Sequence, residues 1–456
     1  MPVNSFDNYP LTWKPDKDKL RSPYYKYLSD DLENKIINGL LKPGTLLPPQ
    51  REIADYLDIN YTTITRVYDN LKKKGLIYVV MGKGTYVAYF HEMVNEEVNG
   101  DCIELGAVNA FSQYSDLVYK ATREVIEKGY LHKLYEYSKP EGHPHQLMAA
   151  KRWLEQLNVH CDIDELAILT GAQNALCVAL LALFHPNDKI ACDEFTYANL
   201  IDLAKMLNII LVPIDNDDNG MIADDLEKKV KSMGIKGVYL MPGCSNPTTI
   251  IMPMDRRKAI ARVIKENDLI LIEDDISAWL FADEMAFTSF YDLLDHNSVY
   301  ICGMTKSLCP GLRIAYMAFS RKYRKNILNA ILNVNIKTSS LDAEIISQLV
   351  LNGDGYKIAS KKKKMTKEAC DIYYQYFDDK YHNVSYYKWL KINCDKPMEV
   401  LENELLALGV RVYHSDRFKV KVTNNDHYLR ISLCSCENKQ KLKKGLEILK
   451  HYLDNN

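Results

Sequence analysis

The sequence predicts a small winged helix-turn-helix domain followed by a large α/β domain with helices on both faces of a sheet. Three observations support this prediction. The first ninety residues have the pattern of three short helices and a glycine-tipped hairpin. Beyond about residue 150, apolar runs typical of strands alternate with helical stretches. The length of 456 residues suffices for two or three domains with well-filled cores.

Composition and charge exclude several classes of protein. Apolar content of 47% and charged content of 26% are ordinary for a soluble globular protein, and the net charge of -2 argues against a protein that coats nucleic acid. The 11 cysteines include no CxxC pair, which favours reduced thiols over disulfides or metal ligands. We find no signal-peptide core, and the longest apolar stretch, 175–184, is too short to cross a bilayer. We therefore expect a cytoplasmic protein without a membrane segment.

The N-terminal pattern defines three helices. The first begins at Tyr24, the second runs from about Pro49 to Leu57, and the third follows the N-cap residue Asn60. The hairpin of residues 76–88 turns at Gly82-Lys83-Gly84. Such a third helix can enter a major groove while the hairpin lies near a minor groove. From the pattern alone, a small helical adaptor domain with a solvated polar face remains the alternative.

Several motifs narrow this choice: Leu41-Lys42-Pro43-Gly44, Leu47-Pro48-Pro49-Gln50-Arg51-Glu52, Thr62-Thr63-Ile64, Gly75-Leu76 and Gly82-Lys83-Gly84-Thr85. Over about 65 residues they resemble the GntR winged-helix family. The resemblance implies that DNA is contacted by Arg51, Tyr61, Thr62, Thr63, Arg66, Gly82, Lys83 and Gly84. Pro49 replaces the usual capping serine, and Tyr61 stands where an arginine is common, so the operator sequence cannot be carried over from relatives.

The rest of the chain has five predicted strands: Leu166–Leu169, Lys189–Ala191, Gly237–Leu240, Leu269–Ile272 and Val299–Ile301. In open α/β sheets, ligands bind beyond the carboxyl ends of the strands. We expect a winged-helix domain at 1–88, a linker at 89–112 and the large domain at 113–456. Its large subdomain spans about 150–350, and its small subdomain comprises the remaining N- and C-terminal parts.

Lys306 and Arg313 follow the last predicted strand. A buried lysine can lose its proton and condense with an aldehyde, forming a Schiff base. An arginine provides a planar fork of donors that suits a phosphate. Together the two residues predict pyridoxal 5'-phosphate, which needs both a carbonyl partner and a phosphate anchor.

Other candidates follow other strands, and each has a plainer alternative. Gly171-Ala172-Gln173 opens a helix and presents free N–H groups to an anion, or is an ordinary turn. Asp274 can hold a pyridine nitrogen protonated, or cap a following helix. Asn246 can place its amide against a ring hydroxyl, or start a turn with Pro247. Tyr197 can stack on a ring, although the chain has 31 tyrosines.

In order and spacing, these residues resemble the fold-type I aminotransferases over about residues 113–456. Joined to a GntR head, this is the layout of the MocR regulators. The resemblance implies that Lys306 forms the internal aldimine and Asp274 faces the pyridine nitrogen. It places Asn246 against the ring hydroxyl, Tyr197 over the ring, and Ala172, Gln173 and Arg313 around the phosphate. Arg430 matches the family's arginine for a substrate carboxylate; by itself it reads as a surface arginine on a strand.

Two positions depart from that pattern. Ile276 stands where the family usually has a tyrosine that hydrogen-bonds the ring oxygen, and isoleucine cannot donate this bond. Thr249 replaces a common glycine. We expect cofactor binding to survive these changes and turnover to be less efficient.

Two further features receive the plainer interpretation. Lys361 to Lys364 is a four-lysine run that is better explained as a solvated helix face than as a second DNA contact. His143 and His145 are too few for a metal site. No metal site is predicted.

These observations predict a transcription regulator that binds double-stranded operator DNA as a homodimer. It would sense pyridoxal phosphate itself, or an amine or amino acid, through an aldimine at Lys306. The alternative is an active pyridoxal-phosphate-dependent aminotransferase carrying a DNA-binding head. A third reading, a domain that has lost its cofactor, predicts no effect of Lys306→Ala.

Overall fold

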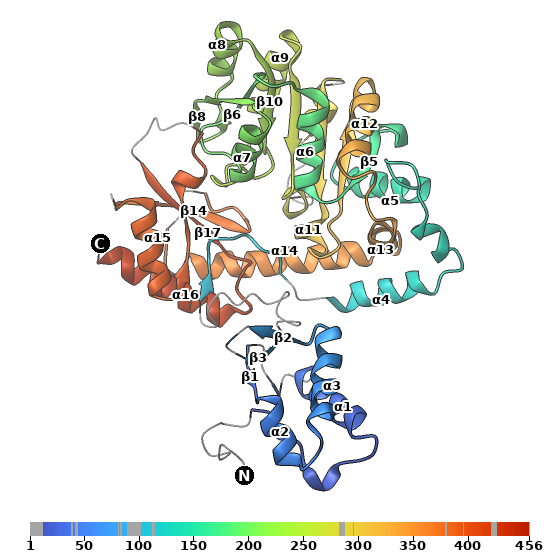
Figure 1. Ribbon diagram of the computed structural model, residues 1–456. Helices are drawn as coiled ribbons and strands as arrows, with labels where there is room; N and C mark the ends of the chain where they lie inside the picture. Colours follow the sequence, from blue (N-terminus) through green and yellow to red (C-terminus); the bar gives the residue numbers. More distant parts are fainter. Residues whose placement is uncertain are drawn as a thin grey trace. The chain divides into compact units, whose positions relative to one another are not determined.

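The computed structural model describes residues 12–455 except 38–39, 42–43, 81, 83, 89–101, 112–114, 282–287, 295, 379–380, 395 and 421–425. The chain divides into two compact units, Met1–Cys102 and Ile103–Asn456, which are drawn in Figure 1. Most of the predicted linker, 89–101, lies outside the described residues.

The N-terminal unit is a winged helix-turn-helix, as predicted. Its helices are α1 (Tyr24–Ile37), α2 (Gln50–Leu57) and α3 (Tyr61–Lys73), and its antiparallel strands are β1 (Leu46–Leu47), β2 (Ile77–Val80) and β3 (Gly84–Val87). Asn60 caps α3, because its side chain accepts a hydrogen bond from Thr62 N at 2.8 Å. Pro49 is the N-cap of α2 and not its first-turn residue, since its backbone is still extended.

The hydrophobic core of this unit follows the predicted stripes. Leu28 and Leu32 of α1 are fully buried, together with Ile64 and Leu71 of α3. Tyr24, which was expected to begin the stripe of α1, is 45% exposed. The two-residue strand β1 was not predicted, because so short a segment has no period to detect.

The second unit is built on a seven-stranded sheet in the order β5-β13-β12-β11-β10-β6-β7. The strands are β5 (Leu166–Leu169), β6 (Lys189–Asp193), β7 (Ile210–Ile214), β10 (Ile235–Leu240), β11 (Ile270–Asp274), β12 (Ser298–Gly303) and β13 (Ala315–Phe319). All five predicted strands are present. β7 and the antiparallel β13 were missed.

Helices cover both faces of this sheet (Figure 1). Alternate residues of β12 point to opposite faces, because Val299 and Ile301 join one hydrophobic cluster and Tyr300 joins another on the other side of the sheet. The helices around the sheet are α5 (Pro144–Glu155), α6 (Ala172–Leu183), α7 (Ala198–Met206), α8 (Ala223–Met233), α9 (Met254–Glu266), α10 (Phe290–Leu294), α12 (Arg324–Val334) and α13 (Ser340–Leu351). The predicted α/β fold is confirmed.

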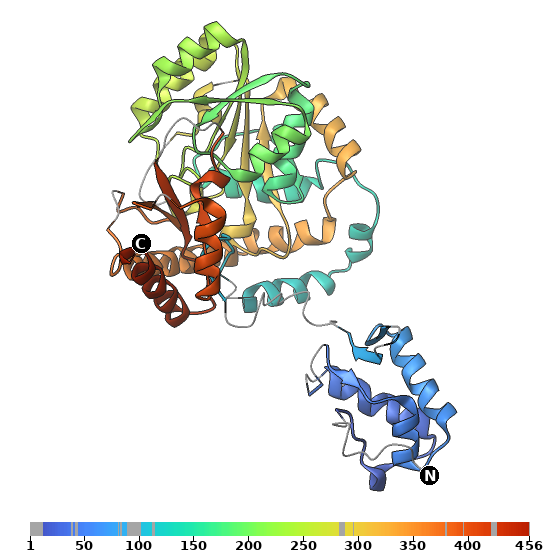
Figure 2. The same ribbon diagram turned by 60° about the vertical axis from the view of Figure 1, so that its left-hand side comes forward.

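A smaller antiparallel sheet has the order β14-β17-β16, with β14 (Tyr387–Ile392), β16 (Tyr413–His414) and β17 (His427–Ser432). The short strand β4 (Ile103–Glu104) pairs with β15 (Val410–Arg411). Helices α4 (Ser115–Ile126), α14 (Asp354–Tyr373), α15 (Met398–Ala407) and α16 (Lys439–Asp454) complete the unit. Figure 2 shows β14 and β17 beside the C-terminal helices. In the described part of the chain, no helix has the length and apolar character needed to span a bilayer. All eleven cysteines are free thiols.

Candidate functional site

Lys306 lies on the short helix α11 (Met304–Ser307), directly after β12. Its Nζ donates hydrogen bonds to the carbonyls of Val108 and of Asn109, the latter at 3.2 Å. Burial lowers the pKa of Lys306, and the positive charges of Arg430 and Arg313 lower it further. The free amine, which is the nucleophilic form, is therefore favoured more than in an exposed lysine.

A cavity of about 130 Å³, here called the smaller cavity, lies at the carboxyl ends of the strands. It is lined by Ala172, Gln173, Tyr197, Met241, Asp274, Ile276, Gly303, Thr305, Lys306 and Arg313. The structure thus brings together six of the residues expected to hold the cofactor. Of the other two, Gly171 lies against the Arg313 guanidinium and Asn246 lines a second cavity, as described below.

One end of the smaller cavity suits an anion. Gly171 is the N-cap of α6 with φ +81°, so the first N–H groups of that helix face the turn. A Cβ at Gly171 would lie 2.8 Å from a terminal nitrogen of Arg313, so glycine permits the close approach of the guanidinium. Thr305 adds a hydroxyl that sequence analysis missed, because a threonine beside the lysine has no distinguishing pattern.

The lining of the smaller cavity also includes a buried carboxylate. Asp274 is the last residue of β11 and is 3% exposed. Its Oδ2 accepts a hydrogen bond from the Tyr239 hydroxyl at 2.8 Å, and its Oδ1 has no hydrogen-bond partner among the described residues. Burial raises the pKa of Asp274 to about 7, although the bond from Tyr239 opposes this rise. The orphaned oxygen fits a ligand with an N–H donor.

A cavity of about 630 Å³, the larger cavity, shares Tyr197, Ile276 and Lys306 with the smaller one. Arg430 of β17 lines it and is only 6% exposed, so the reading as a surface arginine is wrong. Its two terminal nitrogens donate to Asn246 Oδ1 at 3.0 Å and to the Gly106 carbonyl at 2.9 Å. Asn246 lines the same cavity, and its Nδ2 is the amide end not used by Arg430.

The remaining predicted residues have clear places. The Tyr197 hydroxyl donates to Gln173 Oε1 at 3.1 Å, which ties the start of α7 to that of α6. Ile276 is in both cavity linings and offers only an apolar side chain. Thr249 is fully buried with φ +62°, a conformation that favours the glycine common at this position.

The run Lys361–Lys364 was expected to form a solvated helix face, but one of its lysines is buried. Lys362 is 1% exposed, and its Nζ donates to the Leu308 carbonyl at 2.6 Å. Burial lowers the pKa of Lys362 to about 8, with a smaller contribution from Lys306. The prediction was wrong for this lysine because α14 packs one side against the segment that follows Lys306. Lys362 therefore helps to fix the position of α11.

In the N-terminal unit, Arg51, Tyr61, Thr62 and Arg66 are exposed, and Thr63 is partly exposed. Arg51 of α2 lies over the Tyr61 ring at 5.8 Å, which joins the two helices at the start of α3. Arg66 lies over Tyr25 at 4.4 Å. Gly82 and Gly84, both exposed with positive φ, flank the turn between β2 and β3. Lys83 lies outside the described residues.

Both units of the chain match known protein families. Residues 101–448 match the model of aminotransferase class I and II, and residues 24–87 match that of the bacterial regulatory proteins of the gntR family. An uncharacterized HTH-type transcriptional regulator of Bacillus subtilis (strain 168), YdeF, is 33% identical over 463 residues, covering 100% of this chain and 99% of that protein.

Two solved structures share the fold of the larger unit. Kynurenine aminotransferase of Pyrococcus horikoshii, in complex with PMP, has a TM-score of 0.72 at 20% identity and covers 78% of this chain and 91% of its own. The α-aminoadipate aminotransferase LysN of Thermus thermophilus, complexed with N-(5'-phosphopyridoxyl)-L-leucine, has a TM-score of 0.71 at 18% identity and covers 84% and 97%. These findings support pyridoxal 5'-phosphate as the cofactor. The chain belongs to the MocR-type transcriptional regulators, in which a GntR helix-turn-helix domain precedes an aminotransferase class I and II domain.

Proposed function

We propose that this regulator binds operator DNA through its winged helix and responds to a ligand through pyridoxal phosphate attached to Lys306. The main support for this proposal is the position of Lys306, which lines both the smaller and the larger cavity. One cavity would hold the cofactor and the other would admit an amine or amino acid. The position of the Lys306 side chain would then depend on what is bound in each cavity.

The smaller cavity fits the cofactor at each end. Bound pyridoxal phosphate supplies an aldehyde for amines and a ring that withdraws electrons. The first N–H groups of α6, the Thr305 hydroxyl and the Arg313 guanidinium would bind its phosphate. Asp274 Oδ1, buried and without a partner among the described side chains, would hold a proton at the pyridine nitrogen.

Three residues would orient the ring between these ends. Asn246 Nδ2 would donate to the ring hydroxyl, because Arg430 already occupies Asn246 Oδ1. Tyr197 would cover the ring, with its hydroxyl held by Gln173. Lys306 would provide the amine, whose pKa is lowered by burial.

The larger cavity supports an effector with an amine and a carboxylate. Arg430 would bind the carboxylate, and the amine would compete with Lys306 for the cofactor. Release of Lys306 would change the packing of Val108 and Asn109, whose carbonyls it contacts now. In a homodimer this change would alter how two winged helices meet two half-sites on DNA. If pyridoxal phosphate itself is the signal, its attachment to Lys306 would be enough to change DNA binding, without an amine.

The presence of both Lys306 and Asp274 also supports a second function, amino-group transfer, with Lys306 moving the proton. Ile276, which cannot donate a hydrogen bond to the ring oxygen, weighs against efficient turnover. Sustained keto-acid production from a panel of amino donors would favour this second function.

The proposal is tested by titrating full-length protein with DNA from its own upstream region. The titration is run with and without pyridoxal phosphate, and with amino acids and their decarboxylated amines. We expect the affinity or the footprint to change with the cofactor or a ligand, and Lys306→Ala to abolish this change. Lys364→Ala, which removes an exposed lysine of α14, should respond normally. DNA binding that is identical under every condition would contradict the proposal.

A further inference from the structure

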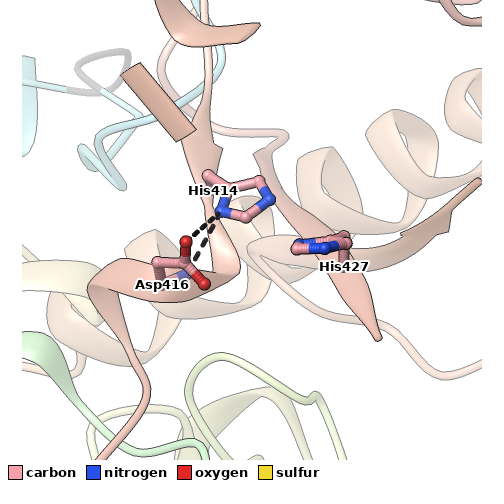
Figure 3. Close-up of side chains that lie close together, drawn as sticks. All are labelled: His414, Asp416 and His427. Atoms are coloured by element: carbon pink, nitrogen blue, oxygen red, sulfur yellow. Dashed lines mark hydrogen bonds and ion pairs between the residues drawn. The ribbon is translucent and has the colours of Figure 1, made fainter. Parts of the chain in front are cut away.

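A separate group of ligating side chains lies at the edge of the small sheet, in β16, in the turn η7 (Ser415–Arg417) and in β17. Figure 3 shows His414 between Asp416 and His427. One nitrogen or carboxylate oxygen from each residue lies within 4.8 Å of the other two. We propose that His414, Asp416 and His427 bind a divalent transition-metal ion, with Zn²⁺ as the best match.

The pairing of the strands explains why the two rings meet. In the antiparallel register of β16 and β17, His414 lies opposite Leu429. His427 is two residues from Leu429 and therefore points to the same face of the sheet as His414. The ring centroids are 5.2 Å apart. The turn of η7 then returns the chain, so that Asp416 Oδ2 lies 3.4 Å from His414 Nδ1.

Unsatisfied nitrogens provide the second, independent observation. His414 is fully buried, and its Nε2 has no hydrogen-bond partner among the residues that the structure describes. The same holds for His427 Nδ1. Buried polar atoms are normally paired, and an unpaired one calls for an explanation such as an ion. The two unpaired imidazole nitrogens are available as metal ligands, and the Asp416 carboxylate lies on the Nδ1 side of the His414 ring.

The donor set indicates the kind of ion. Two imidazoles and one carboxylate suit Zn²⁺ better than Ca²⁺ or Mg²⁺, which prefer oxygen ligands. Asp416 Oδ2 faces His414 Nδ1, which also accepts the Asp416 N–H at 3.3 Å, so the Asp416 side chain would rotate to meet an ion bound at Nε2. Its Oδ1 lies 3.8 Å from Lys419 Nζ. Tetrahedral bonds of about 2.0–2.2 Å place ligand atoms roughly 3.3–3.6 Å apart, so the side chains would close by roughly 1 Å. Water would fill the remaining position.

The ion would have a structural consequence for the larger cavity. Asp416 lines that cavity, and β17 carries both His427 and Arg430. A bound ion would join β16, η7 and β17, and so fix the strand that presents Arg430. The site itself depends only on the three ligands and not on the proposed cofactor chemistry.

The test uses full-length protein stripped with a chelator and dialysed. We expect calorimetric titration with Zn²⁺ to show one tight site per chain. His427→Ala and Asp416→Asn should each weaken this site by about 100-fold or more, because each removes one of three protein ligands. Co²⁺ should give the visible absorption of a four-coordinate site in wild type, and lose it in both variants.

His160→Ala is the matched control. His160 Nδ1 lies 2.7 Å from Asp292 Oδ2, but this pair is outside the three-residue cluster found among the described side chains. The variant should bind Zn²⁺ as wild type does. Circular dichroism establishes that each variant is folded, and Asp416→Asn is a conservative change at a half-exposed side chain. Equal Zn²⁺ binding in wild type and both ligand variants, or no stoichiometric binding in wild type, would overturn the proposal.

Discussion

The smaller and the larger cavity share Lys306 but are assembled in different ways. The smaller cavity is formed by turns at the ends of neighbouring strands of one sheet, and its lining includes Arg313 and Asp274. The larger cavity is formed by segments far apart in the chain, including 107–108, 198–205 and 413–419. Its lining mixes both signs of charge.

Because the two cavities are built differently, cofactor binding and ligand choice should be separable by substitution. Strand ends hold their polar groups in fixed positions, which suits a single cofactor. A cavity between separate segments can accept different ligands and can change shape when one binds. Substitutions in the smaller cavity should therefore abolish cofactor binding. Substitutions of larger-cavity residues without a proposed cofactor contact, such as Arg430, should alter ligand choice and leave the cofactor in place.

The largest effect is expected at Asp274. Asp274→Asn removes the buried charge that would pair with the pyridine nitrogen, and breaking such a pair costs about 3–5 kcal/mol. We expect the affinity for pyridoxal phosphate, measured by absorbance titration, to fall by about 100-fold or more. Asp202→Asn, a loss of an exposed carboxylate in the larger cavity, should leave the affinity unchanged. Equal losses in both variants would remove the distinction between the cavities.

Lys362 is expected to contribute a pH-dependent term to stability. Its folded pKa of about 8 lies below the ordinary lysine value of 10.5, so between these pH values the unfolded chain binds more protons. The contribution of Lys362 to the free energy of unfolding therefore rises with pH across this window, by up to about 3 kcal/mol. Lys362→Met should lack this rise in denaturant titrations at pH 8 and pH 10.5.

Lys364→Met provides the control for Lys362, because Lys364 lies on the exposed side of α14. Its free energy of unfolding should follow wild type across the same pH range. If the free energy of unfolding has the same pH dependence in Lys362→Met and in wild type, then burial does not lower the pKa of Lys362.

Arg430 should decide ligand choice in the larger cavity. Arg430→Met removes the donors for a carboxylate, and hydrogen bonds to charged groups contribute about 1.5–3 kcal/mol. We expect the preference for an amino acid over its decarboxylated amine to fall by about 10- to 100-fold in binding titrations of the loaded protein. The affinity for pyridoxal phosphate should fall far less than in Asp274→Asn. A loss of cofactor as large as that would show that the cavities cannot be separated.

The smallest effect is expected at Tyr239. Tyr239→Phe removes the hydroxyl that donates to Asp274 Oδ2, so the pKa of Asp274 should rise further above about 7. A single hydrogen bond contributes about 1 kcal/mol, and the affinity for pyridoxal phosphate at pH 7 should fall by about fivefold. Tyr300→Phe, at a buried tyrosine of β12 outside the smaller-cavity lining, should not change it. An unchanged affinity in Tyr239→Phe would mean that the hydrogen bond from Tyr239 to Asp274 does not contribute to cofactor binding.

Much of the smaller cavity was predictable because its residues follow apolar runs. The strands ending before Gly171, Asn246 and Lys306 were identified from sequence, and strand ends in such sheets face a common edge. Tyr239 and Thr305 were missed for a physical reason. Tyr239 lies in a strand that is buried at every position except Lys236, so it is read as a core residue. A single hydroxyl gives no periodic signal.

Other features depend on contacts that no local pattern encodes. A run of four lysines does not reveal which one turns inward, so the burial of Lys362 needed the packing of α14. His414 and His427 meet only through strand register, across a turn and a stretch of intervening chain. The walls of the larger cavity come from segments separated by up to about 300 residues, so its shape could not be predicted.

Chemical trapping would show whether Lys306 is the residue that binds the cofactor covalently. Full-length protein is mixed with pyridoxal phosphate, reduced with borohydride, digested, and its labelled peptide is sequenced by mass spectrometry. We expect the label on Lys306 and its absence in Lys306→Ala. A label on a different residue, or no label in wild type, would rule out Lys306 as the attachment site.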